Sequence, residues 1–192
     1  MDNHLLSYLS QYVKLTKDEI EFVEKNSNVK NRKKGTVLLR EGQISKNTFL
    51  VLEGCVKSYY LNDGDETITG FYTQKDLIIP AGYANQEPSP HYISCVGDCI
   101  ISSGTKESTS RFLELHPRLA QICLQITNLQ LAHHQLSYDS YRLLSPEARY
   151  QKFVADRPDL VNLIPQYMIA NYLGIRPQSL SRIRKRLVNS KE

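Results

Sequence analysis

The spacing of apolar residues changes twice along this 192-residue chain, and these changes constrain its fold more than any other feature. Residues 5–26 have helical spacing, and Thr16–Glu19 is a capping-box pattern that predicts the start of a second short helix. From residue 31 onward the period shortens, and short β-like runs alternate with glycine-containing turns; the runs are 36–39, 48–52, 55–61, 67–72, 91–96 and 99–102. The Asp63-Gly64 pair predicts a tight hairpin. Short strands at this spacing indicate a sandwich or barrel, and we favour a jelly roll.

Helical spacing returns after Ser110, and a long helix is expected to begin at Pro117 and to end near residue 144. Its apolar positions step by three and four residues, as in the seam of a coiled coil. The seam consists of Leu119, Ile122, Ile126, Leu129, His133 and Leu136 and continues to Leu143. A seam of this length is more than one small barrel needs, so we predict that it forms a parallel two-helix dimer interface. The alternative is a helix that packs along its own barrel.

A further helical region follows Ser145-Pro146, which is a helix-start signal. Between residues 164 and 187 the spacing predicts a helix, a tight turn and a second helix, which is typical of a helix-turn-helix. Ala170 lets the two helices cross closely, and Gly174 suits a turn with positive φ. Pro177 fits the first turn of the second helix. The shared core is expected to hold Ile169, Leu173, Ile175, Leu180 and Ile183.

Positive charge is concentrated in the same segment. Residues 165–192 hold six Lys/Arg and one acid, whereas residues 1–164 hold 18 basic and 19 acidic residues, so the tail accounts for the formal net charge of +4. Such a local patch favours a polyanion, and DNA fits because a helix enters the major groove, where arginine bonds guanine and glutamine bonds adenine. The exposed side of the second helix is expected to carry Gln178, Ser181, Arg182 and Lys185. The alternative is an amphipathic hairpin whose basic side is merely solvated.

The composition argues against several other classes of protein. No apolar run reaches the ~18 residues of a membrane span, and the N-terminal residues lack a secretory signal, so we expect a cytoplasmic protein with no membrane partner. The five histidines show no H-x-H pattern, and no catalytic set of side chains stands out, so we expect no metal, no cofactor and no enzyme activity. The cysteines are expected to be buried free thiols. If one strand carried both Cys95 and Cys99, they would lie about 13 Å apart on one face.

The order of barrel, long heptad helix and helix-turn-helix resembles the family of the cyclic AMP receptor protein and the fumarate–nitrate regulator over nearly the whole chain. The barrel segments that are similar to strand-and-turn segments of that family are K-K-G-T-V-L-L-R-E-G-Q (33–43), F-L-V-L-E-G-C-V-K (49–57) and F-Y-T-Q-K-D-L-I (71–78). The tail, 164–187, matches the DNA-reading segment of that family without a gap. The resemblance implies an α+β fold: N-terminal helices with a cyclic-nucleotide-binding-like jelly-roll barrel in residues 1–116, a dimerisation helix in 117–144 and a helix-turn-helix domain in 145–192.

Carried over by position, the resemblance implies DNA base contacts from Pro177, Gln178, Ser181 and Arg182. It implies phosphate contacts from Tyr167, Arg176, Ser179, Lys185 and Arg186. Gln178 stands where the family often has glutamate, so the preferred base at that position is expected to differ. Arg176 stands where the family often has a Ser or Thr cap, which should weaken the helix start by up to about 1 kcal/mol while adding a cation near a phosphate.

The residues that hold a cyclic nucleotide in that family are replaced here. Its Gly-Glu pair falls on Ile79-Pro80, its Arg-Ser pair falls on Pro90-His91, and no arginine occurs between Glu41 and Ser110. A buried phosphate without such donors costs on the order of several kcal/mol, so we expect no cyclic AMP binding. The same stretch offers a pocket for another effector, formed by Tyr72, Ile79, Pro80, Tyr83, His91, Tyr92 and His134. The family's iron–sulfur cluster and its C-terminal wing are not expected either.

These observations predict a sequence-specific transcription regulator that binds near-palindromic double-stranded DNA as a homodimer. RNA polymerase and an unidentified small-molecule effector are the further partners that the resemblance implies. The alternative is a ligand-binding or protein-interaction module with a jelly-roll barrel, whose basic tail does not bind DNA.

Overall fold

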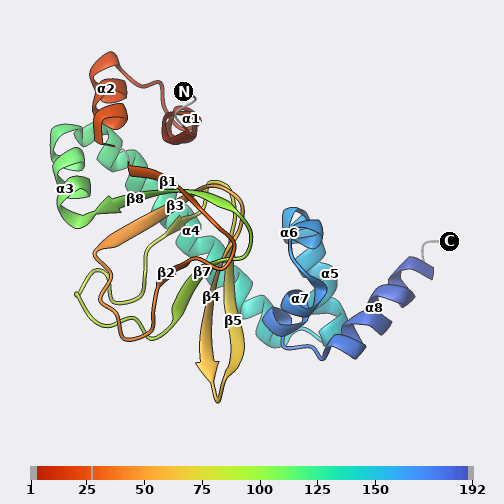
Figure 1. The fold of residues 1–192 in the computed structure, drawn as a ribbon. Coiled ribbons are helices and arrows are strands. Elements are labelled where there is room, and N and C mark those ends of the chain that lie inside the picture. The colour runs from red at the N-terminus through yellow and green to blue at the C-terminus, as the bar shows by residue number, and fades with distance from the viewer. Residues whose placement is uncertain (1–3, 27, 190–192) are drawn as a thin grey trace. The chain divides into compact units, whose positions relative to one another are not determined.

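The computed structural model describes residues 4–26 and 28–189, and Figure 1 shows the order of their elements. The chain forms two compact units, Met1–Thr127 and Asn128–Glu192. The boundary between the units falls inside the long helix α4 (Pro117–Leu143), whereas the sequence set this helix apart as a segment of its own.

Two four-stranded antiparallel sheets form the jelly-roll-like part of the first unit. The first sheet has the order β1 (Asn28–Arg32), β8 (Cys99–Thr105), β3 (Asn47–Glu53) and β6 (Leu77–Ile78). The second sheet has the order β2 (Val37–Leu39), β7 (Tyr92–Cys95), β4 (Val56–Asn62) and β5 (Asp65–Tyr72). The predicted hairpin is confirmed, because Asp63 and Gly64 join β4 to β5 with φ values of 52° and 90°, as a primed two-residue turn requires.

The core of the barrel is built from the alternate residues of these strands that point inward. On β3, Phe49 and Val51 belong to this core, whereas Leu50 and Leu52 belong to a second cluster on the outer face of the first sheet. The remaining buried members of the barrel core are Leu39, Val56, Ile78, Ile93, Cys95, Cys99 and Ile101. The first sheet is therefore apolar on both faces and needs a cover on its outer side.

Three helices supply side chains to that outer cluster: α1 (His4–Ser10), α2 (Lys17–Asn26) and α3 (Lys106–Leu115). The predicted capping box opens α2, since the Thr16 N–H donates to Glu19 Oε2 at 2.7 Å and the Glu19 N–H donates to Thr16 Oγ1 at 3.3 Å. The Arg118 guanidinium on α4 also donates to the Glu19 carboxylate at 2.6 Å, which ties α2 to the start of the long helix.

The sequence analysis missed β1, β6 and α3. The strand β1 (N-V-K-N-R) is polar and largely exposed, so no apolar alternation marks it. The strand β6 has only two residues. Helix α3 begins directly after β8, before Ser110, because the Thr105 hydroxyl caps it by accepting from the Ser108 N–H at 3.1 Å.

The two neighbouring cysteines do not share one strand. Cys95 ends β7 and Cys99 begins β8, and both thiols are free and buried, as is Cys55. The Cys99 thiol lies 3.2 Å from the Cys55 carbonyl oxygen, and its hydrogen bond with Cys95, together with burial, raises the pKa of the Cys95 thiol. The condition for the estimate of about 13 Å between the two cysteines is therefore not met, because the chain leaves the second sheet after Cys95 and enters the first sheet at Cys99.

The residues of the predicted seam on α4 differ in how far they are buried. Leu119 and Ile126 are 1% and 6% exposed, so the first unit covers them itself. Leu129, three residues after Ile126, is 69% exposed, and Leu124, Leu131 and Leu143 are also exposed. Ile122 is half-buried. The side chains of His133 and Leu136 lie outside the part that the structure describes. Leu119 and Ile126 thus serve the monomer core, which is the alternative named for this helix, while exposed leucines continue beyond them.

The second unit is helical after α4. Its helices are α5 (Pro146–Asp156), α6 (Pro158–Leu163), α7 (Gln166–Leu173) and α8 (Pro177–Asn189). The predicted start of α5 is confirmed, because the Ser145 hydroxyl accepts from the Ala148 N–H at 3.3 Å. Arg157 and Pro158 separate α5 from α6, since α5 ends at Asp156 and Pro158 is the first residue of α6. Within the described ranges, no helix is sufficiently long and apolar to span a bilayer.

Candidate nucleic-acid interface

The turn between α7 and α8 sets the direction of the basic helix. Gly174 has φ 63° and ψ 37°, the left-handed conformation that the sequence predicted. The Ile175 N–H donates to the Ala170 carbonyl at 2.8 Å, and the Gly174 N–H donates to the Asn171 carbonyl at 3.0 Å. These bonds close the C-terminus of α7 before Pro177 begins α8. The start of α8 is thus positioned by backbone geometry, not by a flexible linker.

The predicted core beneath the two helices is confirmed. Ile169 and Ala170 on α7 have no exposed surface, and Ala170 is small enough to allow close packing at this point. On α8, Leu180 and Ile183 are 2% and 4% exposed. Leu173 and Ile175 are buried as well. One side of α8 is therefore held against the unit, and its opposite side is left to solvent.

Arg149 is a positioning residue that the sequence analysis missed. Its Nη1 donates to the Leu173 carbonyl at 2.6 Å and so satisfies one of the last acceptors of α7, one residue before the turn. The Nε of Arg149 is buried with no hydrogen-bond partner among the described residues. Nothing in the local pattern of α5 distinguishes this arginine from the solvent-facing ones, because its partner lies 24 residues away.

The side of α8 opposite the buried residues carries the predicted base-reading side chains. Gln178, Ser181, Arg182 and Lys185 are all exposed, and the helical period places the centre of this group about 150° from both Leu180 and Ile183. We call these four residues the recognition face. Pro177 is exposed at the first position of the helix.

The predicted phosphate contacts lie around this face. Tyr167 on the first turn of α7 is 59% exposed, and Arg176 and Ser179 are exposed beside the start of α8. Arg186 differs from the others, because its guanidinium pairs with the Glu147 carboxylate at 2.8 Å. This ion pair is largely solvent-exposed, so a phosphate can compete for Arg186 at small cost. Arg184 is exposed on the other flank of α8 and was not among the predicted contacts.

The residues predicted to form one effector pocket lie in different places. Tyr72 packs against the barrel core, and burial raises its pKa. Tyr92 stacks on Tyr59 with 5.3 Å between ring centroids, and the His91 ring lies 5.5 Å from the ring of Tyr60.

The remaining residues of the predicted effector pocket do not join Tyr72, His91 and Tyr92 in one binding site. Burial lowers the pKa of His91 and so disfavours the charged imidazolium that would bind a phosphate. Pro80 is buried, and the side chain of His134 lies outside the described part. Ile79 and Tyr83 instead line a cavity beside the first sheet.

Among the described residues, no group of three His, Cys, Asp or Glu side chains is suited to a metal ion.

Part of the first unit is similar to a described domain family. Residues 29–116 match the family model for the cyclic nucleotide-binding domain. No curated protein matches the chain significantly in sequence.

Solved structures of transcription regulators share the fold of most of the chain. FixK2 from Bradyrhizobium japonicum superposes with a TM-score of 0.72 at 17% identity, covering 86% of each chain. The c-di-GMP-responsive global regulator CLP of Xanthomonas campestris has a TM-score of 0.67 at 17% identity, covering 92% of this chain and 93% of its own. The catabolite activator protein of Thermus thermophilus has a TM-score of 0.52 at 16% identity, with 96% and 88% covered. These neighbours are Crp/Fnr-type regulators, and the likeness is one of fold.

Proposed function

We propose that this chain is a sequence-specific, DNA-binding transcription regulator that acts as a homodimer in the cytoplasm. The observation that carries the proposal is the recognition face of α8: four polar or basic side chains point to solvent while Leu180 and Ile183 anchor the helix from behind. The fold shared with Crp/Fnr-type regulators supports the same function.

The chemistry of the recognition face suits the major groove. The Arg182 guanidinium can donate two hydrogen bonds to guanine, and the Gln178 amide can pair with adenine. Lys185 and Arg176 add cations that carry no base preference and suit phosphates. In this proposal α7 and α8 form a helix-turn-helix, Arg182 is the main base contact, and Pro177 and Ser181 complete the base-reading set.

A dimer would place two such faces about 34 Å apart, one turn of DNA, so that they read a near-palindromic site. One exposed leucine of α4 supports this step. Leu129 is on the predicted seam and is 69% exposed, and a second copy of the chain packed on the seam would remove this apolar surface from water.

We propose further that the barrel does not bind cyclic AMP. The positions aligned with the family's phosphate-binding pairs are Ile79-Pro80 and Pro90-His91, which supply no standing cation. By analogy with the family that the sequence resembles, a regulator of this kind would also contact RNA polymerase.

The proposal is tested by selecting binding sites from random double-stranded DNA with the full chain. We expect an enriched sequence with two inverted half-sites about ten base pairs apart. The matched control is the chain with Arg182→Ala, which should lose the enrichment at one base position of each half-site. An unenriched pool from the wild-type chain would reject the proposal and favour a module whose basic helix is only solvated.

The dimer is tested separately through Leu129, which is both on the predicted seam and exposed. Leu129→Glu should convert a particle of twice the chain mass into a monomer, as measured by light scattering after gel filtration. Leu115→Glu is the matched control, because Leu115 is an exposed leucine on α3, outside the long helix. A monomeric wild-type chain at micromolar concentration would contradict this step.

A further inference from the structure

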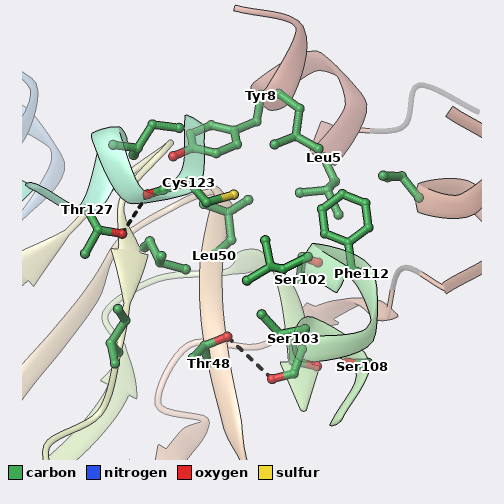
Figure 2. Close-up of a pocket in the computed structure, with 18 of the residues that line it drawn as sticks. Leu5, Tyr8, Thr48, Leu50, Ser102, Ser103, Ser108, Phe112, Cys123 and Thr127 are labelled. Atoms are coloured by element: carbon green, nitrogen blue, oxygen red, sulfur yellow. Dashed lines mark hydrogen bonds between the residues drawn. The ribbon is translucent and has the colours of Figure 1, made fainter. Parts of the chain in front are cut away.

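A cavity of about 400 Å³ lies in the first unit, on the outer face of the first sheet. Figure 2 shows side chains from separate elements facing one space: Tyr8 from α1, Leu50 from β3, Ser102 from β8, Phe112 from α3 and Cys123 from α4. We call this space the α1–α4 cavity. Its volume is within the usual range of small-molecule sites.

The cavity is distinct from the barrel interior. On β3, Thr48 and Leu50 line the cavity, while Phe49 and Val51 between and beside them point into the barrel core. On β8, Ser102 lines the cavity and Ile101 faces the core. The position aligned with the family's phosphate-binding arginine, Pro90, is not among the lining residues. A molecule in this cavity would therefore not occupy the interior of the barrel.

The lining carries no formal charge. Every lining residue lies in the described part of the chain, and none of them is Asp, Glu, Lys, Arg or His. Most of the lining surface is apolar, and ten of the twenty lining residues are leucine, isoleucine, valine or phenylalanine. A charged group brought here would lose its hydration without a counterion, which costs several-fold more than burying an uncharged one.

The polar side-chain groups in the wall are hydroxyl and thiol groups, and two of the hydroxyls donate hydrogen bonds to backbone carbonyls. Thr48 Oγ1 donates to the Gly104 carbonyl at 3.4 Å, and Thr127 Oγ1 donates to the Cys123 carbonyl at 2.9 Å. Burial raises the pKa of both the Tyr8 hydroxyl and the Cys123 thiol, so neither ionises near neutral pH. Nine of the twenty lining residues carry a hydroxyl or thiol group, so the wall offers apolar contact together with neutral hydrogen-bonding groups.

We propose that the α1–α4 cavity is a binding site for an uncharged, largely apolar small molecule. The volume, the charge-free lining and the neutral polar groups together select this class of ligand over nucleotides, organic acids and other anions. The inference concerns the first unit alone and does not depend on DNA binding by the second.

The test uses two dyes with the same aromatic skeleton. N-phenyl-1-naphthylamine is uncharged, and 8-anilinonaphthalene-1-sulfonate carries a sulfonate. The chain has no tryptophan, so dye emission can be followed against a weak protein background. We expect saturable binding of one neutral dye per chain and at least tenfold weaker binding of the sulfonate. Binding that does not saturate, or equal affinity for both dyes, would overturn the proposal.

Cys123 provides matched variants, since its thiol faces the cavity (Figure 2). Cys123→Phe fills the space and should weaken neutral-dye binding at least tenfold, whereas Cys123→Ala keeps the space open and should change the affinity less than threefold. Thr127→Phe fills the same wall one turn later and replaces Cys123→Phe if that variant does not fold. Unchanged affinity in a filled variant with a wild-type circular dichroism spectrum would show that the dye binds elsewhere and would overturn the assignment.

A protection measurement needs no variant. The neutral dye should slow alkylation of Cys123 by N-ethylmaleimide at least threefold in the wild-type chain, as read by peptide mass spectrometry. Cys55 on the barrel side is the internal reference and should be unaffected. Equal alkylation of Cys123 with and without saturating dye would also overturn the assignment.

Discussion

The recognition face of α8 and the α1–α4 cavity are opposite kinds of surface. The first carries charge and hydrogen-bond donors on one exposed helix, and its cations Arg182 and Lys185 point away from the core. The second is apolar and free of formal charge, and it is assembled from α1, α2, the outer face of the first sheet, α3 and α4. The two surfaces therefore match the two different proposed partners, a hydrated polyanion for one and a desolvated neutral molecule for the other.

The comparison also separates the forces that act at each site. Contacts with DNA phosphates release counterions, so their strength depends on salt. Transfer of an apolar molecule into a cavity depends on the area removed from water and is nearly independent of moderate salt.

Salt should separate the two sites most strongly. Arg176, Lys185 and Arg186 of two subunits give about six phosphate contacts, so raising salt from 50 to 200 mM should weaken DNA binding by about 10³-fold. Binding of N-phenyl-1-naphthylamine should change less than twofold over the same range. Fluorescence anisotropy of labelled DNA and dye emission measure the two affinities in one buffer series. A salt-independent DNA affinity would remove the contrast.

Within the recognition face, base and phosphate contacts should respond differently. Arg182→Ala should reduce discrimination between the selected site and random DNA by about 1–3 kcal/mol, because a bidentate guanine contact is lost. Lys185→Ala should instead weaken both DNAs equally and lower the salt slope by about one for each subunit. Competition binding with the two DNAs measures both. Equal losses on both DNAs for Arg182→Ala would show that Arg182 contacts only the backbone.

The position of the recognition face should depend on one glycine. Gly174→Ala places a side chain at φ 63° and should lower the free energy of unfolding of the second unit by about 1–2 kcal/mol. Gly97→Ala is the matched control, because that glycine has open space around it and no strained φ, so the change should stay within about 0.5 kcal/mol. Urea denaturation followed by circular dichroism measures both. Neutral-dye affinity should remain unchanged in either variant.

The stability of the first unit should depend on pH through Glu19, which lies on α2, one of the helices that line the cavity. Burial alone would raise the pKa of this carboxyl group, but hydrogen bonds from the Thr16 N–H and the Arg118 guanidinium outweigh burial and lower it. Because the folded-state pKa is below the unfolded one, this stabilisation is complete above about pH 5 and is lost as pH falls through the folded value.

The corresponding variant is Glu19→Gln, which should lower the free energy of unfolding at pH 7 by about 1 kcal/mol and flatten its dependence on acid pH. Glu21→Gln, at an exposed position of the same helix, is the control. Urea midpoints from pH 3 to 7 measure the effect. An equally steep acid dependence in Glu19→Gln would assign the pH sensitivity to other groups, and the second unit should show none of this change.

The sequence predicted those features whose cause lies within a few residues. The capping box at Thr16, the hairpin at Asp63-Gly64, the cap at Ser145 and the turn at Gly174 all depend on local hydrogen bonds or on φ, and all are confirmed. The composition of the recognition face follows from the 3.6-residue period of one helix, so its exposed residues could be named in advance.

Other features left no local signal. The polar edge strand β1 pairs with β8, about 70 residues later in the chain, and its own residues show no apolar alternation. Arg149 supports the end of α7 from a different helix, and the predicted effector residues separate because β7 and the segment after β6 present them to different surroundings.

By itself, the sequence determined that a strand-rich part is followed by helices and which side of α8 carries charge, because periodicity and capping act over one or two turns. Only the tertiary structure decided that Leu119 and Ile126 belong to the core of their own unit, and that helices far apart in sequence leave a neutral cavity against the first sheet. Burial depends on which surfaces meet, and a pattern along one segment does not contain the shape of the surface that covers it.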